Sequence, residues 1–243
     1  MRQGKFEILN NRALAENVYE LTLRGDSSEI TRPGQFVQIQ LDNFFLRRPI
    51  SVCDVQDRTL TLIYKVVGRG TGAMAALKTG AQLDLLTGLG NGYDLALCGE
   101  NPLLIGGGAG VPPMYLLARR LLERGARVQV ILGFNTRDEI FYEDKFRALG
   151  ADVQVSTVDG SYGVKGFVTD AMAGLSYSHV CACGPEPMLR AVYNACNTSG
   201  QFSFEERMGC GFGACMGCSC ETKYGSKRIC KDGPVLVKEE IVW

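Results

Sequence analysis

The stretch PLLIGGGAGVPPMYLLARRLLERG, residues 102–125, joins a short apolar run, a row of glycines and an apolar pattern with helical spacing. The run before the glycines is typical of a buried strand. Pro112 suits the first turn of a helix, and Gly125 suits the position just after its last turn. The apolar residues in between recur with helical period and are expected in the core: Met114, Leu117, Leu121 and Leu122. The stretch therefore predicts a unit of strand, glycine loop and helix.

The same alternation continues to about residue 200. Apolar runs such as RVQVILGF, DVQVSTV and SHVCACG alternate with the helical patterns YEDKFRALG, TDAMAGL and EPMLRAVYNAC. Alternation of this kind predicts an α/β doubly wound parallel sheet. We assign residues 99–200 to this nucleotide domain.

The preceding residues, 1–98, have the pattern of short strands instead. VYELTLRG, GQFVQIQL, LTLIYKVVG and AQLDLLTG are separated by turn residues. In the second of these runs Val37 and Ile39 fall on one face, and Gln38 and Gln40 on the other. Short strands at this spacing predict an antiparallel β-barrel or sandwich. The sequence as a whole predicts a multi-domain protein.

The composition excludes some partners. Lys+Arg and Asp+Glu number 26 each among 243 residues, so there is no basic surplus of the kind that favours nucleic acid. The N-terminal sequence MRQGKFEILNN has no apolar core of a signal peptide, and no apolar stretch is long enough for a membrane helix. We expect a cytoplasmic protein in a reducing compartment, where clustered cysteines serve metals or redox chemistry more often than disulfides.

Two glycine-containing loops are candidates for nucleotide binding. In the first loop, GGGAG, the glycines have no Cβ atom, so the backbone can approach a pyrophosphate at the N-terminus of the following helix. The spacing of these glycines is not G-x-G-x-x-G, and simple packing explains them equally well. The second loop, in CACGPEPML, also follows a strand and precedes a helix; a free cysteine there is most often only a small buried residue. Both loops lie at carboxyl ends of strands, where they could line one crevice. The candidate residues are Gly106, Gly107, Gly108, Ala109 and Gly110, with Cys183, Gly184 and Pro185.

The predicted barrel has its own candidate for binding an anion. FLRRPISV places Arg47 and Arg48 before a proline and Ser51. A guanidinium binds a diphosphate well, and a serine hydroxyl suits a phosphate or a flavin edge. Further on, YKVVGRGTGAMA contains a glycine turn at residues 68–72 that opens a short helix and is a second potential anion cradle.

Together these motifs resemble the ferredoxin-reductase superfamily of flavoproteins. The resemblance rests on R-P-I-S in a barrel, followed by an α/β domain with a glycine loop and C-G-P-x-x-M. It implies that FAD is bound by Arg48, Pro49, Ile50, Ser51, Tyr64, Lys65, Val66, Gly70, Thr71 and Gly72. It also implies that the two glycine loops shape the site for a nicotinamide dinucleotide. Ile50 stands where many relatives have a flavin-stacking tyrosine.

We assign the end of the chain, residues 201–243, to a small third domain, which is too short for an independent core and contains a cysteine cluster. Cys210-x4-Cys215-x2-Cys218 has the plant-type [2Fe–2S] spacing, and Cys230 follows as a fourth thiolate. Nearby glycines could direct amide N–H groups at the cluster sulfurs. Zinc is the main alternative, but it usually takes two C-x2–4-C knuckles; disulfides or free thiols are another. Cys220 is interpreted as a bystander.

The short gap before the last cysteine separates this chain from reductases with a C-terminal plant-type ferredoxin domain, which need room for a β-grasp fold. GCGFGACMGCSCE and ICKDGPVL instead resemble the electron-transfer subunits of two-subunit, NAD-linked dihydroorotate dehydrogenases. The resemblance implies a partner subunit that contains FMN and oxidises dihydroorotate to orotate, in a heterotetramer with two copies of each chain. It also implies electron flow from FMN through the [2Fe–2S] cluster and FAD to NAD⁺. The related small subunits of NADPH-dependent ferredoxin oxidoreductases have aspartate for one cysteine, so four cysteines favour the dihydroorotate family.

Hydride transfer between nicotinamide and flavin requires stacking and distance, so no side chain is assigned a catalytic acid–base role. Asp138 and Glu139 would repel a 2′-phosphate, whereas Arg137 could attract one; we predict NAD rather than NADP. His179 begins a predicted core strand and is interpreted as structural. Two alternative functions stay open: a flavin reductase that serves a diffusible ferredoxin, and a zinc-stapled interaction module. The apolar residues around the cluster are either packing or a docking patch: Phe202, Phe204, Met208, Phe212 and Met216.

Overall fold

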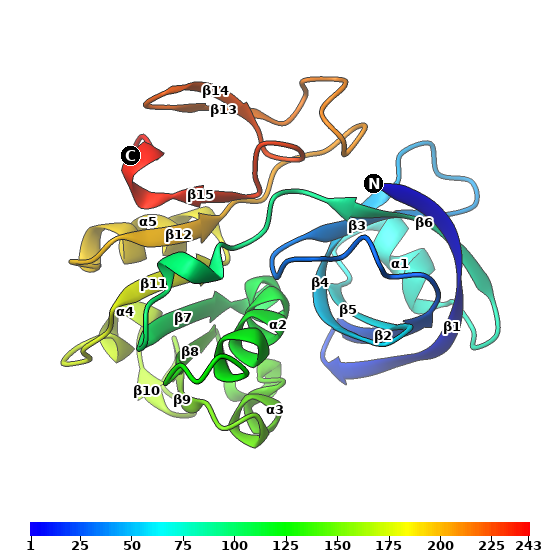
Figure 1. Cartoon of the computed structure of the whole chain (residues 1–243). Coiled ribbons are helices and arrows are strands. Elements are labelled where there is room, and N and C mark those ends of the chain that lie inside the picture. The colour runs from blue at the N-terminus through cyan, green and yellow to red at the C-terminus, as the bar shows by residue number, and fades with distance from the viewer.

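The computed structural model describes all residues, 1–243, and shows a β-barrel beside an α/β domain, with the C-terminal segment across the top of both (Figure 1). The barrel is closed and antiparallel, in the order β1-β2-β5-β4-β3-β6. The predicted barrel is therefore confirmed. Its strands are β1 (Arg2–Ala15), β2 (Val18–Arg24), β3 (Phe36–Gln40), β4 (Arg48–Gln56), β5 (Thr59–Lys65) and β6 (Gln82–Leu89), and its helix is α1 (Arg69–Ala75).

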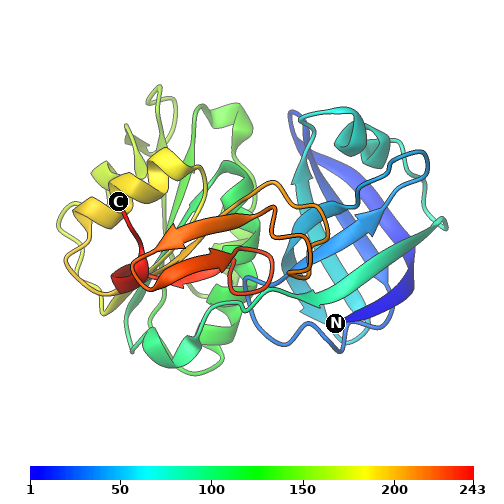
Figure 2. The same cartoon turned by 90° about the horizontal axis from the view of Figure 1, so that it is seen from above.

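The alternation of side chains along β3 determines which of them point into the barrel core. Val37 and Ile39 are completely buried in the barrel core, as the pattern predicts. Gln38 lies on the opposite face of the strand but is also completely buried. This happens because the C-terminal segment covers that outer face, so polar and apolar alternation here does not mean solvent on one side (Figure 2).

The second unit is a seven-stranded sheet in the order β10-β9-β8-β7-β11-β12-β15, parallel except for its last pair. This confirms the doubly wound α/β fold. Helices α2 and α3 cover one face and α4 and α5 the other. The strands are β7 (Pro102–Gly107), β8 (Gln129–Phe134), β9 (Asp152–Thr157), β10 (Val164–Lys165), β11 (His179–Cys183), β12 (Gly200–Ser203) and β15 (Val235–Val237); the helices are α2 (Val111–Leu122), α3 (Glu143–Ala148), α4 (Val168–Ala171) and α5 (Glu186–Ala195).

The cysteine-rich segment continues this sheet. β12 pairs with β11 in parallel and β15 pairs with β12 antiparallel, so a boundary at residue 201 falls within a strand. Between them lies a separate hairpin of β13 (Ser219–Thr222) and β14 (Gly225–Arg228). Asn91, in the linker after the barrel, donates to the carbonyl of Val235 at 2.7 Å. The α/β sheet and the linker after the barrel therefore support this segment, which has too few residues for a core of its own.

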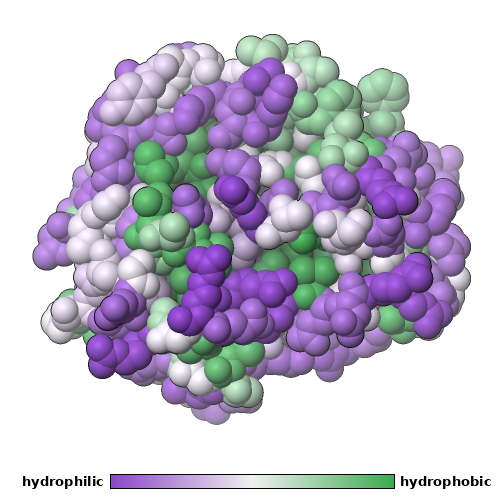
Figure 3. All heavy atoms as spheres, in the orientation of Figure 1, coloured by the Kyte–Doolittle hydropathy of each residue, from purple (hydrophilic) through white to green (hydrophobic).

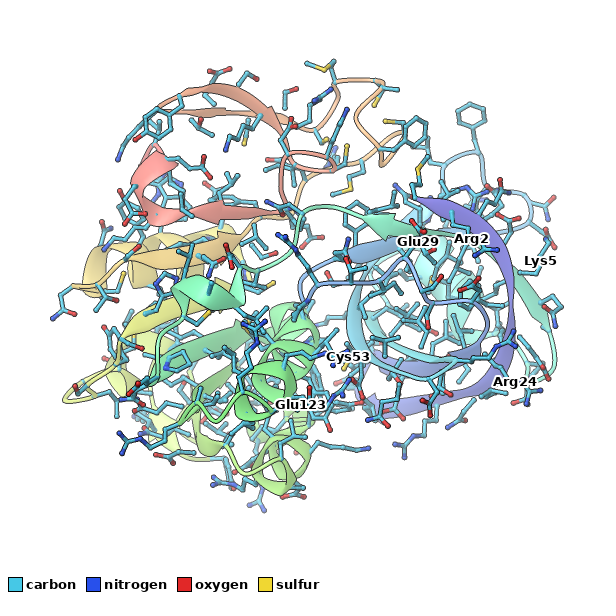
Figure 4. The ribbon with its side chains drawn as sticks, viewed as in Figure 1. Arg2, Lys5, Arg24, Glu29, Cys53 and Glu123 are labelled. Atoms are coloured by element: carbon cyan, nitrogen blue, oxygen red, sulfur yellow. The ribbon has the colours of Figure 1, made fainter.

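The barrel and the α/β domain share a core. Helix α2 packs against β4 as well as against β7. Arg119 of α2 donates to Asp54 of β4 at 2.7 Å, and the hydroxyl of Tyr142 donates to Glu20 of β2 at 2.7 Å. Cys53 is buried at this junction (Figure 4). No helix combines the length and apolar character needed to cross a bilayer.

Candidate functional site

The two glycine loops lie side by side in the α/β sheet. The chain leaves the β7–β8–β9–β10 half and returns to start β11 on the other side of β7, so the carboxyl ends of β7 and β11 form the topological switch point. Cys183 is paired with Gly106 across these strands. A β-carbon on Gly110 would overlap the carbonyl of Cys183, and one on Gly107 would overlap the sulfur of Met188. These glycines are therefore needed for close approach, and the loop leads directly into α2, whose N-terminus favours a phosphate.

A small cavity lies between the barrel and the first glycine loop. Tyr64 and Lys65, predicted to bind FAD, line it from the barrel, and Gly108 and Ala109, predicted to bind a nicotinamide dinucleotide, line it from the α/β domain. Hydride transfer needs both groups in one place, so this is the arrangement that the prediction requires. Sequence reasoning did not assign the other lining residues to this site: Glu16, Val18, Ile63, Phe134 and Phe141. It singled out Glu139, which also lines the cavity, only as a charge that would repel a 2′-phosphate. Phe134 and Phe141 have no motif around them that could have indicated this role.

The paired arginines of β4 have different environments. Arg47 is neutralised by Asp84 at 2.6 Å. Arg48 has no carboxylate partner; it donates to the carbonyl of Leu46 at 2.7 Å and lies 4.8 Å from the centre of the Phe44 ring. A β-carbon on Gly70 would overlap the Arg48 guanidinium, so this free cation lies directly against the glycine turn at residues 68–72. A cation over a glycine turn at a barrel edge fits a diphosphate.

The other predicted flavin residues are held by local contacts. The Thr71 hydroxyl accepts hydrogen bonds from the backbone N–H groups of Val67 and Gly68, at 3.0 and 3.3 Å, and so stabilises the turn. The Tyr64 hydroxyl donates to Asn11 at 3.0 Å, and burial raises the pKa of Tyr64 to about 12. Ile50 packs partly against the barrel core. Of the remaining predicted residues, Pro49 and Ser51 lie in β4, Val66 directly follows β5, and Gly72 lies in α1.

The four cysteines form two pairs. The sulfur of Cys210 accepts from the backbone N–H groups of Ala214 and Cys215 at 3.2 and 3.4 Å. The sulfur of Cys218 accepts from the backbone N–H of Cys230 at 3.4 Å. No three His, Cys, Asp or Glu side chains of the chain converge as a single metal ion requires. Two pairs fit a [2Fe–2S] cluster, in which each iron takes two thiolates, better than one tetrahedral zinc.

The two pairs differ in their electrostatics. Partial burial would raise the pKa of Cys210, but hydrogen bonds from the N–H groups of Phe212, Cys215 and Ala214 outweigh it and lower the pKa to about 6. Burial raises the pKa of Cys230 to about 12. Backbone donors aimed at Cys210 are what a metal-bound thiolate needs. Cys220 lies in β13 opposite Lys227 and belongs to neither pair.

Two further features lie away from this site. His179 is buried at the amino end of β11, opposite to the end that carries the glycine loop, and its Nε2 lies 3.3 Å from the Gln201 amide. A wholly polar hollow is lined by Arg2, Lys5 and Arg24 among others, on the side of the barrel away from the α/β domain (Figure 4). Arg24 is paired there with Glu7 at 2.6 Å.

Comparison with known proteins agrees with this architecture. The family described as "Oxidoreductase NAD-binding domain" matches residues 104–194, and the "Iron-sulfur cluster binding domain of dihydroorotate dehydrogenase B" matches residues 205–242. A ferredoxin NADP⁺ reductase from Neisseria gonorrhoeae, solved with bound FAD and NADP, shares the fold, with a TM-score of 0.70 and 16% identity over 80% of this chain and 90% of that one. The fold and the site thus define an oxidoreductase of the ferredoxin-reductase class with an iron–sulfur segment.

Two full-length relatives narrow the class. The "Dihydroorotate dehydrogenase B (NAD(+)), electron transfer subunit" of Bacillus pumilus (strain SAFR-032) is 41% identical, covering 99% of this chain and 98% of its own. The protein with the same description from Bacillus cereus (strain B4264) is 43% identical, covering 100% and 99%. The chain belongs to the family of dihydroorotate dehydrogenase B electron transfer subunits. The structure titled "Insights into flavin-based electron bifurcation via the NADH-dependent reduced ferredoxin-NADP oxidoreductase structure" is also similar, with a TM-score of 0.88 and 31% identity over 98% of this chain and 90% of that one.

Proposed function

We propose that this chain is the electron-transfer subunit of an NAD-linked dihydroorotate dehydrogenase. It receives electrons from an FMN-containing catalytic subunit and delivers them to NAD⁺. One observation carries the proposal: the loop that contains Cys210, Cys215 and Cys218 (residues 204–218, the cysteine loop) lies across β3, the strand next to the R-P-I-S segment of β4, so the predicted cluster ligands lie close to the predicted flavin residues. Gly211 of this loop contacts Gln38 of β3, and Gln38 is paired with Pro49.

Two sets of residues would bind the two nucleotides, FAD and the nicotinamide dinucleotide. Arg48 and the turn at residues 68–72 would hold the FAD diphosphate, because Arg48 has no carboxylate partner of its own. The loop at residues 106–110 and the segment at residues 183–185 would hold the dinucleotide at the switch point. When bound, the flavin exchanges a two-electron hydride for single electrons, and the cluster carries them one at a time.

The protein contributes distance and exclusion of water rather than proton transfer. The cavity between Tyr64 and Gly108 is narrow and includes Phe134 and Phe141. A nicotinamide bound at this junction would lie against the barrel, which favours a short transfer distance. The side chains that line this cavity include no histidine, since the only one in the chain is buried elsewhere.

The surface around the cluster supports a docked partner. Phe45 is 99% exposed and Met216 54% exposed, on the loop after β3 and on the cysteine loop. Leu46 and Phe212 of the same two loops are also exposed. Figure 3 shows hydrophobic residues, in green, at the upper right of the molecule. We define these four residues as the apolar patch, and infer that the catalytic subunit covers it, with its FMN on the cluster side. In contrast, Phe202 is completely buried and packs with Trp243.

Co-expression with an FMN-containing dihydroorotate dehydrogenase subunit tests the proposal. We expect a complex with two copies of each chain and NAD⁺-dependent dihydroorotate oxidation that neither subunit shows alone. Phe45→Glu together with Met216→Glu should weaken assembly at least tenfold, while Phe167→Glu, at an exposed site at the start of α4, should not. Failure of the two chains to associate, or equal loss with Phe167→Glu, would contradict the proposal.

A second candidate function is reduction of a diffusible ferredoxin. The 31% identity with the chain of the reduced ferredoxin–NADP oxidoreductase structure favours it. Ferredoxin reduction by this chain alone, at a rate equal to or above that of the dihydroorotate complex, would select this alternative.

A further inference from the structure

Gln38 lies between the barrel and the cysteine loop with nothing to bond to. Its side chain is completely buried, and neither Nε2 nor Oε1 has a hydrogen-bond partner. The only other buried side-chain group in this condition is the hydroxyl of Ser156. A buried amide without a partner is destabilising, so a group that is not part of the chain is expected to complete its hydrogen bonds.

The neighbouring strands cannot supply that partner. Gln38 is opposite Pro49 on β4 and opposite Leu86 on β6. Neither side chain has a donor or an acceptor. Along β3 itself, the next residue on the same face in one direction is Phe36, and in the other Gln40, whose amide already donates to the carbonyls of Leu41 and Phe44 at 3.1 and 3.0 Å.

The amide is directed at the cysteine loop instead. A β-carbon on Gly211 would overlap the Gln38 Nε2, so the amide contacts the residue that follows Cys210 directly. Gly211 has a φ of +79°, and this backbone conformation lets the loop close over the amide. The Arg47 guanidinium donates to the Gln38 carbonyl at 3.4 Å and to that of Asp84 at 3.1 Å, which helps to fix β3.

We propose that Gln38 Nε2 donates a hydrogen bond to an inorganic sulfide of the cluster, next to its ligand Cys210, and that this bond sets the reduction potential of the cluster. The inference rests on the proposed [2Fe–2S] cluster. Reduction adds one negative charge to the cluster, so an N–H donor stabilises the reduced state more than the oxidised state and raises the potential. Backbone N–H groups of Ala214 and Cys215 already donate to Cys210 from the loop side; Gln38 adds a donor from the barrel side.

The variant Gln38→Met tests this, because it keeps the length of the side chain and removes the amide. In an EPR-monitored redox titration of the purified chain with its cofactors, we expect cluster reduction to become about tenfold less favourable, a fall of about 59 mV for a one-electron couple. Gln40→Met is the matched control on the same strand, and its cluster potential should not change. Equal potentials in wild type, Gln38→Met and Gln40→Met would overturn the inference.

A second measurement does not depend on how the variant folds. Wild-type protein labelled with ¹⁵N in the glutamine side-chain amides should show a weak ¹⁵N coupling to the reduced cluster by pulsed EPR. An iron–sulfur signal without this coupling would overturn the inference and leave the proposed function intact. A chain without iron would instead refute the proposed function.

Discussion

The carbonyl oxygen of Cys183 occupies the space that a β-carbon on Gly110 would need. The obstacle is steric, since the φ of Gly110 is −85° and suits any residue. Gly110→Ala should therefore push the two loops apart and raise the KM for NADH by at least tenfold, with flavin and iron content unchanged. Gly4→Ala, where a β-carbon meets only an ordinary contact of 3.6 Å with Phe6, is the control. An unchanged KM in Gly110→Ala would show that the loops do not form the dinucleotide site.

Arg48 and Arg47 should respond differently to replacement by alanine. Arg48→Ala removes the free cation beside the glycine turn, and we expect the purified protein to lose most of its FAD, measured as flavin per chain. Arg47→Ala removes the nearest cation of Asp84, which keeps Lys5 at 3.6 Å and the Gln3 amide at 2.9 Å, so the thermal stability of the barrel should fall slightly and FAD should be retained. Equal flavin content in the two variants would contradict the role assigned to Arg48.

Asp138 offers a test of dinucleotide preference. It is exposed, while the neighbouring Glu139 accepts hydrogen bonds from the backbone and side-chain amides of Asn135 at 3.1 and 2.9 Å. Asp138→Asn removes one exposed charge, an effect on the order of 1 kcal/mol. We expect kcat/KM for NADPH relative to NADH to rise about fivefold in steady-state assays. A ratio that stays the same would place the 2′-hydroxyl elsewhere.

His179 should make stability depend on pH. Burial lowers its pKa in the folded chain, partly opposed by Glu239, so the unfolded chain binds the proton more tightly. Its contribution is therefore present above the unfolded pKa of about 6.5 and lost as pH falls below that value, by at most about 1.4 kcal/mol per pH unit. His179→Gln should flatten denaturation midpoints between pH 5 and 7. Because the chain has one histidine, NMR of its ring gives the folded pKa directly; a value above 6.5 would contradict this prediction.

Periodicity and turn residues were sufficient to predict both folds. The run at residues 102–107 is wholly buried and ends in glycine, so its strand could be read directly. Strands β1 and β4 were not identified from their pattern. β1 has register shifts that break its alternation. β4 starts with two arginines and a proline, and its other residues alternate irregularly in burial.

The site was only partly predictable, for a physical reason. Loops with glycine, arginine and cysteine at fixed spacings carry their function in local sequence. Gln38 and Phe141 instead owe their proposed roles to segments far away in the chain. Gln38 contacts the cysteine loop, and Phe141 lines the cavity together with Tyr64 of the barrel. Their own neighbours in sequence give no sign of those contacts. The segment at residues 201–243 was assigned to a small domain without a core of its own, and only the pairing of β11, β12 and β15 reveals that it extends the α/β sheet.

The central claim is that two pairs of cysteines bind one [2Fe–2S] cluster, and low-temperature EPR of the anaerobically reduced chain tests it most directly. We expect a single signal of one unpaired electron per chain that Cys220→Ser retains. Serine at any one of the four paired positions, Cys210, Cys215, Cys218 or Cys230, should abolish the signal or shift its g-values. A signal that all four variants keep unchanged, or that Cys220→Ser alone removes, would contradict the claim.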